Sequence, residues 1–88
     1  MSYTVRIAAK PFKFLEGLQD RNLRRRITNS LRALGGNPRP ASCIKLSGPE
    51  ALYRIRIGDY RVVYQIQDAM LMVLVVRIAH RREVYRGS

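Results

Sequence analysis

The sequence predicts a single α+β domain in which two helices cover one face of an antiparallel sheet. Three observations lead to this prediction. The first half of the 88-residue chain carries apolar residues at helical spacing, the second half carries β-branched segments, and a Gly-Asp pair at 58–59 separates two of those segments. A chain of this length forms one domain. Residues 1–88 are therefore expected to fold as one unit with the element order β-α-α-β-β-β-β.

The chain is expected to begin with a strand and a short helix. Residues Tyr3–Ala8 alternate and are rich in β-branched side chains, which favours a strand. Pro11 suits the first turn of the helix that follows. The apolar face of this helix is expected to contain Phe12, Leu15 and Leu18, which recur at helical spacing.

A second helix is expected to complete a helical hairpin. Asp20 is placed to cap its N-terminus, and Gly35-Gly36 followed by Pro38 ends it. The apolar stripe of this helix comprises Leu23, Ile27, Leu31 and Leu34. Its opposite face carries Arg21, Arg24, Arg25 and Arg32.

The rest of the chain reads as a meander of four strands, at Ser42–Leu46, Leu52–Ile57, Tyr60–Ile66 and Met70–Ile78. The last of these is almost wholly apolar, which favours a central strand covered on both faces. The two-residue Gly-Asp loop fixes the pairing of the second and third strands. Six apolar or aromatic residues then face the helices: Ile57, Tyr60, Ile55, Val62, Tyr53 and Tyr64.

On the other face of this hairpin the register places like charges together. Arg56 falls opposite Arg61, and Arg54 falls opposite Val63. Like charges directly opposite one another destabilise a sheet by a few tenths to about 1 kcal/mol. We interpret this arrangement as an anion site. The alternative is a solvated outer face on which salt screens the repulsion.

The net charge of +11, with 17 Lys+Arg against 6 Asp+Glu, points to a polyanionic partner. Only three of the seventeen cations are lysines, which leaves fourteen arginines, and the planar fork of arginine suits phosphate contacts. Nucleic acid or the ribosome is the first candidate, and an acidic protein is compatible with either. A lone cysteine, no signal-peptide pattern and no long apolar run favour a cytoplasmic protein without a membrane segment.

The C-terminal segment places His80, Arg81 and Tyr85 close together in sequence. If the last strand stays regularly extended, His80 lies on the same side of the sheet as Arg61. One cysteine and one histidine make a metal site implausible, and no cofactor motif is present. RNA cleavage needs neither, because the 2′-hydroxyl is the nucleophile and fixed cations stabilise the transition state. Either Tyr85 or His80 can serve as the acid or base.

Three segments resemble the RelE/ParE superfamily of bacterial and archaeal toxin–antitoxin toxins. They are IKLSG at 44–48, LYRIRIGDYRVVY at 52–64 and HRREVY at 80–85, and the resemblance extends over nearly the whole chain. The middle segment is specific for the superfamily. The closing segment is similar to the RelE-like branch, because the gyrase-directed ParE-like members generally lack its tyrosine.

This resemblance implies a metal-independent, ribosome-dependent endoribonuclease that cuts mRNA in the A site by 2′-hydroxyl attack and so inhibits translation. Arg61 and Arg81 would hold the scissile phosphate, and Tyr85 would be the general base, with His80 as the second acid/base candidate. Family members carry lysines where this chain has Arg54 and Arg56, and arginine does not readily exchange a proton. The residues expected to contact RNA phosphates are Arg54, Arg56, Lys45, Arg21, Arg24, Arg25 and Arg32.

The same resemblance implies partners and two alternative functions. The partners are an acidic antitoxin, the ribosome with its mRNA, and operator DNA only through the antitoxin. One alternative is a non-catalytic, ParE-like gyrase inhibitor, against which Tyr85 argues. The other is an inactive toxin that acts as a co-repressor when bound to its antitoxin, which the arginines at positions 54 and 56 leave open.

Overall fold

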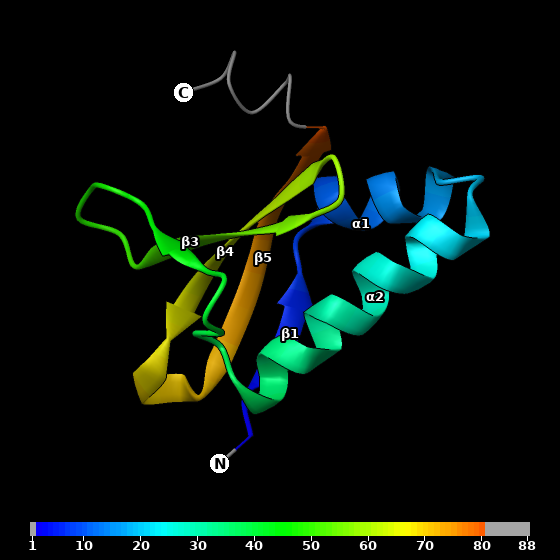
Figure 1. Ribbon diagram of the computed structural model, residues 1–88. Helices are drawn as coiled ribbons and strands as arrows, with labels where there is room; N and C mark the ends of the chain where they lie inside the picture. The colour runs from blue at the N-terminus through cyan, green and yellow to red at the C-terminus, as the bar shows by residue number, and fades with distance from the viewer. Residues whose placement is uncertain (1, 81–88) are drawn as a thin grey trace.

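A computed structural model describes residues 2–80 of the chain. Two helices and five strands follow one another in the predicted order. Figure 1 shows how they are arranged in space. The elements are β1 (Thr4–Ile7), α1 (Ala9–Gly17), α2 (Arg21–Gly36), β2 (Ile44–Lys45), β3 (Leu52–Ile57), β4 (Tyr60–Gln67), the 3-10 turn η1 (Asp68–Met70) and β5 (Met72–His80). Neither helix of residues 2–80 is long and apolar enough to cross a membrane.

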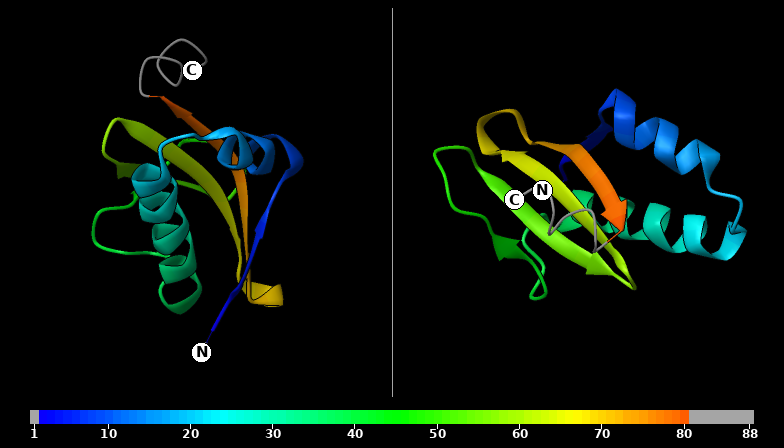
Figure 2. Two further views of the ribbon diagram at one scale, coloured as in Figure 1. Left: turned by 90° about the vertical axis from the view of Figure 1, so that its right-hand side faces the viewer. Right: turned by 90° about the horizontal axis from the view of Figure 1, so that it is seen from above.

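The five strands form one sheet in the order β1-β5-β4-β3-β2. The pairs β2–β3, β3–β4 and β4–β5 are antiparallel, and β1 joins the edge of β5 in parallel. Both helices lie on one side of the sheet, as the two views in Figure 2 make clear. The predicted α+β architecture is therefore confirmed, and the parallel strand β1 makes the sheet mixed. We call the side that faces the helices the inner face and the other side the outer face.

Helix α2 packs as the sequence predicts. The Asp20 side chain accepts a hydrogen bond from the backbone N–H of Leu23 at 3.1 Å and so caps the helix. Ile27, Leu31 and Leu34 are buried against the sheet, and Leu23 packs against the same core. Burial of an aliphatic side chain of this size contributes about 1.5–3 kcal/mol, so this stripe fixes the helix on the inner face.

Helix α1 presents a different face from the predicted one. Pro11 and Leu15 are buried, whereas Phe12 is 49% exposed, so placing Phe12 on the apolar face was wrong. Each residue advances about 100° around a helix, so Phe12 lies well to one side of Pro11 and Leu15. The second phenylalanine takes the inward position instead, because the ring of Phe14 lies 5.7 Å from that of Tyr60.

The hairpin between β3 and β4 has the predicted register. Arg56 lies opposite Arg61, and Arg54 lies opposite Val63. Gly58 adopts φ +59, the left-handed conformation that a two-residue hairpin loop with glycine first requires. This turn sets which side chains reach each face of the sheet.

The pairing of β4 with β5 contains a bulge that the sequence reading missed. Val63 lies opposite Arg77, whereas Tyr64 lies opposite Val75, so one extra residue, Val76, is inserted in β5. The insertion reverses the alternation of every later residue in that strand. Ile78 is buried on the inner face together with Val75, three residues apart instead of two or four.

The loop after α2 is fastened to the far end of the sheet by polar contacts. The Tyr64 hydroxyl, fully buried, donates to the Pro38 carbonyl at 2.8 Å, and burial raises the pKa of this phenol. Arg39 forms a salt bridge to Asp68 at 2.8 Å and donates through Nε to the Tyr53 hydroxyl at 3.2 Å. Tyr3 also donates to Asp68, at 2.5 Å. These contacts hold the loop that leads into β2.

Acid is expected to release the Arg39–Asp68 contact. Hydrogen bonds from Arg39 and then from Tyr3 lower the pKa of the Asp68 carboxyl. The ionised Asp68 carboxylate contributes fully to stability above its pKa in the unfolded chain, about 3.9. This contribution is lost as the pH falls through its lower pKa in the folded chain. The stability advantage of the wild-type chain over Asp68→Asn, measured by urea unfolding, should shrink below about pH 4. Glu50→Gln is the control, since Glu50 has no ion-pair partner within residues 2–80. A wild-type advantage that stays constant through this acid range would contradict the account.

Candidate nucleic-acid interface

Four arginines project from adjacent positions on the outer face of the sheet. Arg56 and Arg61 form one cross-strand pair, and Arg54 and Arg77 flank Val63 in the next row. Directly opposed residues share a face of the sheet. We call Arg54, Arg56, Arg61 and Arg77 the arginine face. Of the four, Arg56 and Arg77 are exposed, Arg54 is half-buried and Arg61 is buried.

Arg61 is the most unusual member of this group. It is 7% exposed, the one buried charged residue among those described, and its Nη1 atom has no hydrogen-bond partner within residues 2–80. A buried polar group without a partner costs about 1–3 kcal/mol, and more when it is charged. The residue directly opposite is another arginine. A phosphate oxygen would supply both the missing acceptor and the missing charge.

The guanidinium of Arg56 lies away from the centre of the outer face. Its Nε donates to the Gly58 carbonyl at 3.0 Å. Strand β2 pairs only with Tyr53 and Arg54, which leaves this part of β3 at an open edge. The Arg56 side chain lines two cavities shared with α2, so it reaches round that edge towards the helix. Because the Arg56 guanidinium points away from Arg61, the electrostatic repulsion between the two side chains is reduced.

Arg77 is a member of the arginine face that the sequence analysis did not predict. A regularly alternating β5 would have pointed it to the inner face beside Val75. The bulge at Val76 reverses this and brings it to the outer face, opposite Val63. The sequence did contain a signal for the bulge. Regular alternation would bury the charge of Arg77 in the core, and the apolar residues Val75 and Ile78 are three positions apart; both features indicate an inserted residue.

The same bulge corrects the prediction for His80. His80 pairs with Tyr60 and not with Arg61, whose partner is Ala79. Its ring meets the Tyr60 ring edge-on at 5.5 Å and 83°. It therefore lies on the inner side of the sheet, and the prediction that it shares a face with Arg61 was wrong.

Lys45 is also not part of the arginine face. It pairs with Tyr53, a core residue that faces the helices, and it is exposed on the edge strand β2. Its neighbour Ile44, opposite Arg54, occupies the outer-face position. Lys45, which was expected to contact RNA phosphates, therefore lies on the other face of the sheet from Arg61.

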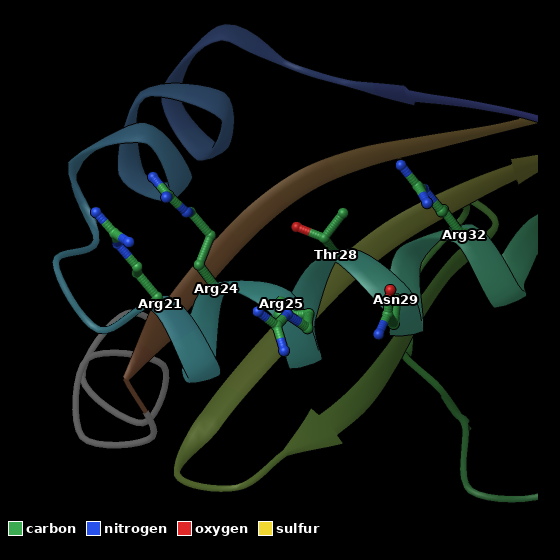
Figure 3. A pocket seen from close by; sticks show the side chains of 6 residues that line it. All are labelled: Arg21, Arg24, Arg25, Thr28, Asn29 and Arg32. Carbon is green, nitrogen blue, oxygen red and sulfur yellow. The ribbon is translucent and has the colours of Figure 1, made fainter.

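The predicted arginines of α2 do come together, on the surface of the helix that faces away from the sheet. Figure 3 shows them around a shallow pocket of about 340 Å³. The pocket is lined by Arg21, Arg24, Arg25, Thr28, Asn29 and Arg32, which we call the α2 stripe. The helix contains no acidic residue. Three of the stripe arginines lie in the first five residues of the helix, where the helix dipole disfavours cations and favours anions. This placement favours binding of an anion over stability of the free helix.

Two predicted catalytic residues, Arg81 and Tyr85, lie outside the described residues. Among residues 2–80 no group of three His, Cys, Asp or Glu side chains is placed to hold a metal ion. The described part of the interface consists of the buried Arg61, its neighbours on the outer face, and the separate α2 stripe. Guanidinium groups of this kind are suited to contact phosphate oxygens.

Comparison with known proteins identifies relatives of this chain. The family model described as "ParE toxin of type II toxin-antitoxin system, parDE" matches residues 6–85. The toxin RelE1 of Methanocaldococcus jannaschii, as that protein is named, is 28% identical over 90 residues, covering 99% of each chain.

Solved structures share the fold. The chain resembles the archaeal RelE–RelB complex of Pyrococcus horikoshii with a TM-score of 0.82 and 31% identity, covering 92% of this chain and 97% of that one. It also resembles the RelBE2 toxin–antitoxin complex of Mycobacterium tuberculosis, with a TM-score of 0.73, 28% identity and coverage of 92% and 100%. The chain therefore belongs to the RelE/ParE superfamily of type II toxin–antitoxin toxins.

Proposed function

We propose that this toxin is a ribosome-dependent endoribonuclease that cuts mRNA in the A site and so inhibits translation. The observation that carries the proposal is the buried guanidinium of Arg61, whose Nη1 has no hydrogen-bond partner within residues 2–80. A protein that only coats nucleic acid uses exposed cations. A cation held in place without an internal partner is suited to a charge that develops during a reaction.

The reaction follows from the chemistry of RNA. The 2′-hydroxyl loses its proton to a base, and its oxygen attacks the adjacent phosphorus. The bond from phosphorus to the 5′-oxygen breaks, that oxygen takes up a proton from water, and a 2′,3′-cyclic phosphate and a 5′-hydroxyl result. Arg61 and Arg81 hold the phosphate and stabilise its added negative charge. Tyr85 takes the proton from the 2′-hydroxyl, a role open to a phenol when nearby positive charge favours the phenolate. Arg54 and Arg56 hold phosphates and move no protons.

The toxin is proposed to act with an antitoxin and within the ribosome. The relatives from P. horikoshii and M. tuberculosis were solved as complexes with their antitoxins. A chain of net charge +11 favours an acidic antitoxin that covers the arginine face and that alone contacts operator DNA. The α2 stripe is proposed to contact ribosomal RNA, because its arginines lie on a different surface from Arg61.

Removing arginines from the α2 stripe is expected to weaken ribosome binding without changing the chemical step. Each phosphate contact that is lost should lower the slope of log affinity against log salt by about 1. The double variant Arg21→Ala/Arg25→Ala should therefore lower that slope by about 2, with the cleavage rate of saturated ribosomes unchanged. Lys13→Ala, an exposed cation on α1, is the control. An unchanged salt slope would exclude the stripe from the ribosome contact.

A second candidate function is inhibition of gyrase without catalysis, which the match to the ParE family model favours. One experiment separates the two. Purified toxin is added to translated mRNA, to free mRNA and to a gyrase supercoiling reaction, beside Arg81→Ala. The proposal expects cuts only in translated mRNA, and their loss in the variant. Intact mRNA together with blocked supercoiling would establish the second function. Intact mRNA with normal supercoiling would favour the co-repressor.

A further inference from the structure

A cavity at the tip of the β3–β4 hairpin is not used by the mechanism above. It has a volume of about 370 Å³ and lies between the tip and the first turns of α2. We call it the hairpin-tip pocket. The side chains in its wall that matter here are Arg26, Asn22, Leu23, Asp59, Tyr60 and Arg56.

The guanidinium of Arg26 lies beside the hairpin turn. Its two terminal guanidinium nitrogens lie 3.6 and 3.8 Å from the point that a β-carbon on Gly58 would occupy. The carbonyl of the same glycine accepts the hydrogen bond from Arg56. Two arginines from different elements therefore converge on the turn. Arg26 belongs to α2 but does not line the pocket of the α2 stripe.

Tyr60 provides a positioned aromatic wall. The Phe14 ring lies 5.7 Å from it and the His80 ring meets it at 5.5 Å. These two ring contacts restrict the rotation of the Tyr60 side chain. Leu23 adds an apolar surface to the same pocket. An aromatic ring held in this way is suited to contact a flat ligand.

The mixture of charges in the hairpin-tip pocket distinguishes it from the α2 stripe. The stripe pocket is lined by arginines and neutral polar residues with no carboxylate, which suits phosphate. Here Asp59 and Asp20 line the same pocket as Arg26 and Arg56, and two carboxylates disfavour an anion. The wall offers a forked donor, an acceptor and an aromatic ring, and a nucleobase uses all three. Guanine fits best, because it presents O6 and N7 to an arginine fork and N–H donors to a carboxylate.

The pocket is adjacent to the proposed cleavage site. Tyr60 and Arg61 are consecutive residues of β4, so their side chains point to opposite faces of the hairpin. A strand of RNA that crosses the tip can place one phosphate at Arg61 and a neighbouring base beside Tyr60. We propose that the hairpin-tip pocket binds a guanine base next to the scissile phosphate, so that Arg26 and Asp59 set the sequence preference of the toxin. This inference rests on the proposed function for its place in the reaction, but base binding is testable without cleavage.

The binding test uses the full chain and the four nucleoside 5′-monophosphates. Amide NMR shifts should show GMP bound at Gly58, Asp59 and Tyr60, at least about fivefold tighter than AMP, CMP or UMP, as one bidentate arginine–guanine contact gives. The phosphate is common to all four, so the difference reports the base. Arg26→Lys keeps the charge but loses the fork, and it should abolish the preference. Arg25→Lys, the neighbouring stripe residue, should retain it.

A second variant guards against misfolding, because Asp59→Asn keeps a residue that hairpin turns favour and removes the carboxylate. It too should lose the preference for GMP. Equal binding of all four nucleotides, or GMP shifts away from the hairpin tip, would overturn the inference. In the cleavage assay, Arg26→Lys should cut more slowly than the wild-type chain beside guanine and so lose the preference for that base. If GMP binds at the tip while no mRNA is cut, the pocket stands and the proposed function fails.

Discussion

Arg61→Met should lower the cleavage rate at least about a hundredfold and at the same time raise the free energy of unfolding by about 1–2 kcal/mol. The rate falls because the scissile phosphate loses a fixed cation where negative charge develops. Stability rises because a buried guanidinium nitrogen without a partner in residues 2–80 disappears, together with its repulsion by Arg56. Methionine preserves the packing of the aliphatic part of the side chain. Single-turnover cleavage on programmed ribosomes and urea unfolding measure the two effects.

A substitution that lowers the cleavage rate but raises the free energy of unfolding identifies Arg61 as a residue kept for function. Loss of a structural residue would lower the free energy of unfolding. Arg56→Met is the matched control on the same outer face, and since Arg56 is exposed its stability should change by less than about 1 kcal/mol. If Arg61→Met instead unfolded more easily than the wild-type chain, the guanidinium would be stabilising in the free protein. The assignment of Arg61 to a substrate phosphate would then be contradicted.

Tyr85→Phe should lower the cleavage rate by about a hundredfold to ten-thousandfold, the usual range for loss of a general base. His80→Gln should cause only a small part of that loss, because His80 pairs with Tyr60 on the inner side of the sheet. Binding to the ribosome should be unchanged in Tyr85→Phe, since the ring remains. Single-turnover rates of both variants decide which residue carries the proton.

The pH dependence gives an independent readout of the same choice. A histidine base produces an inflection near about pH 6.5, whereas a tyrosine base gives a rate that keeps rising above that pH. The account expects the second behaviour in the wild-type chain. A large loss of rate in His80→Gln, together with a wild-type rate that does not keep rising with pH, would assign the proton to His80.

The hairpin and its charges were predictable because a two-residue loop leaves one register. The Gly58 turn sets the pairing of β3 with β4, and the alternation of strands then sends Arg61 to the outer face. The second helix was predictable for a similar reason, since a polar cap and a regular apolar stripe specify both its start and its orientation. Local chemistry determined these elements.

The errors arose where a single residue changed the geometry or where contacts join distant segments. The bulge at Val76 moved Arg77 to the outer face and His80 to the inner one. A prediction that side chains alternate regularly along a strand does not allow for an inserted residue. The contact of Arg39 with Asp68 joins a loop to a turn far along the chain, and no local pattern announces it. The burial of Arg61 also depends on tertiary packing, so sequence indicated its face but not its lack of a partner.

The most direct test of the proposal that the 2′-hydroxyl is the nucleophile blocks that hydroxyl in the substrate. Ribosomes are programmed with an mRNA that carries a 2′-O-methyl group at the nucleotide cut in the A-site codon, beside the unmodified mRNA. The account predicts cleavage of the unmodified message to a 2′,3′-cyclic phosphate and a 5′-hydroxyl, and no cleavage at the methylated position. Equal cleavage of both messages would mean that the 2′-oxygen is not the nucleophile and would contradict the mechanism built around Arg61.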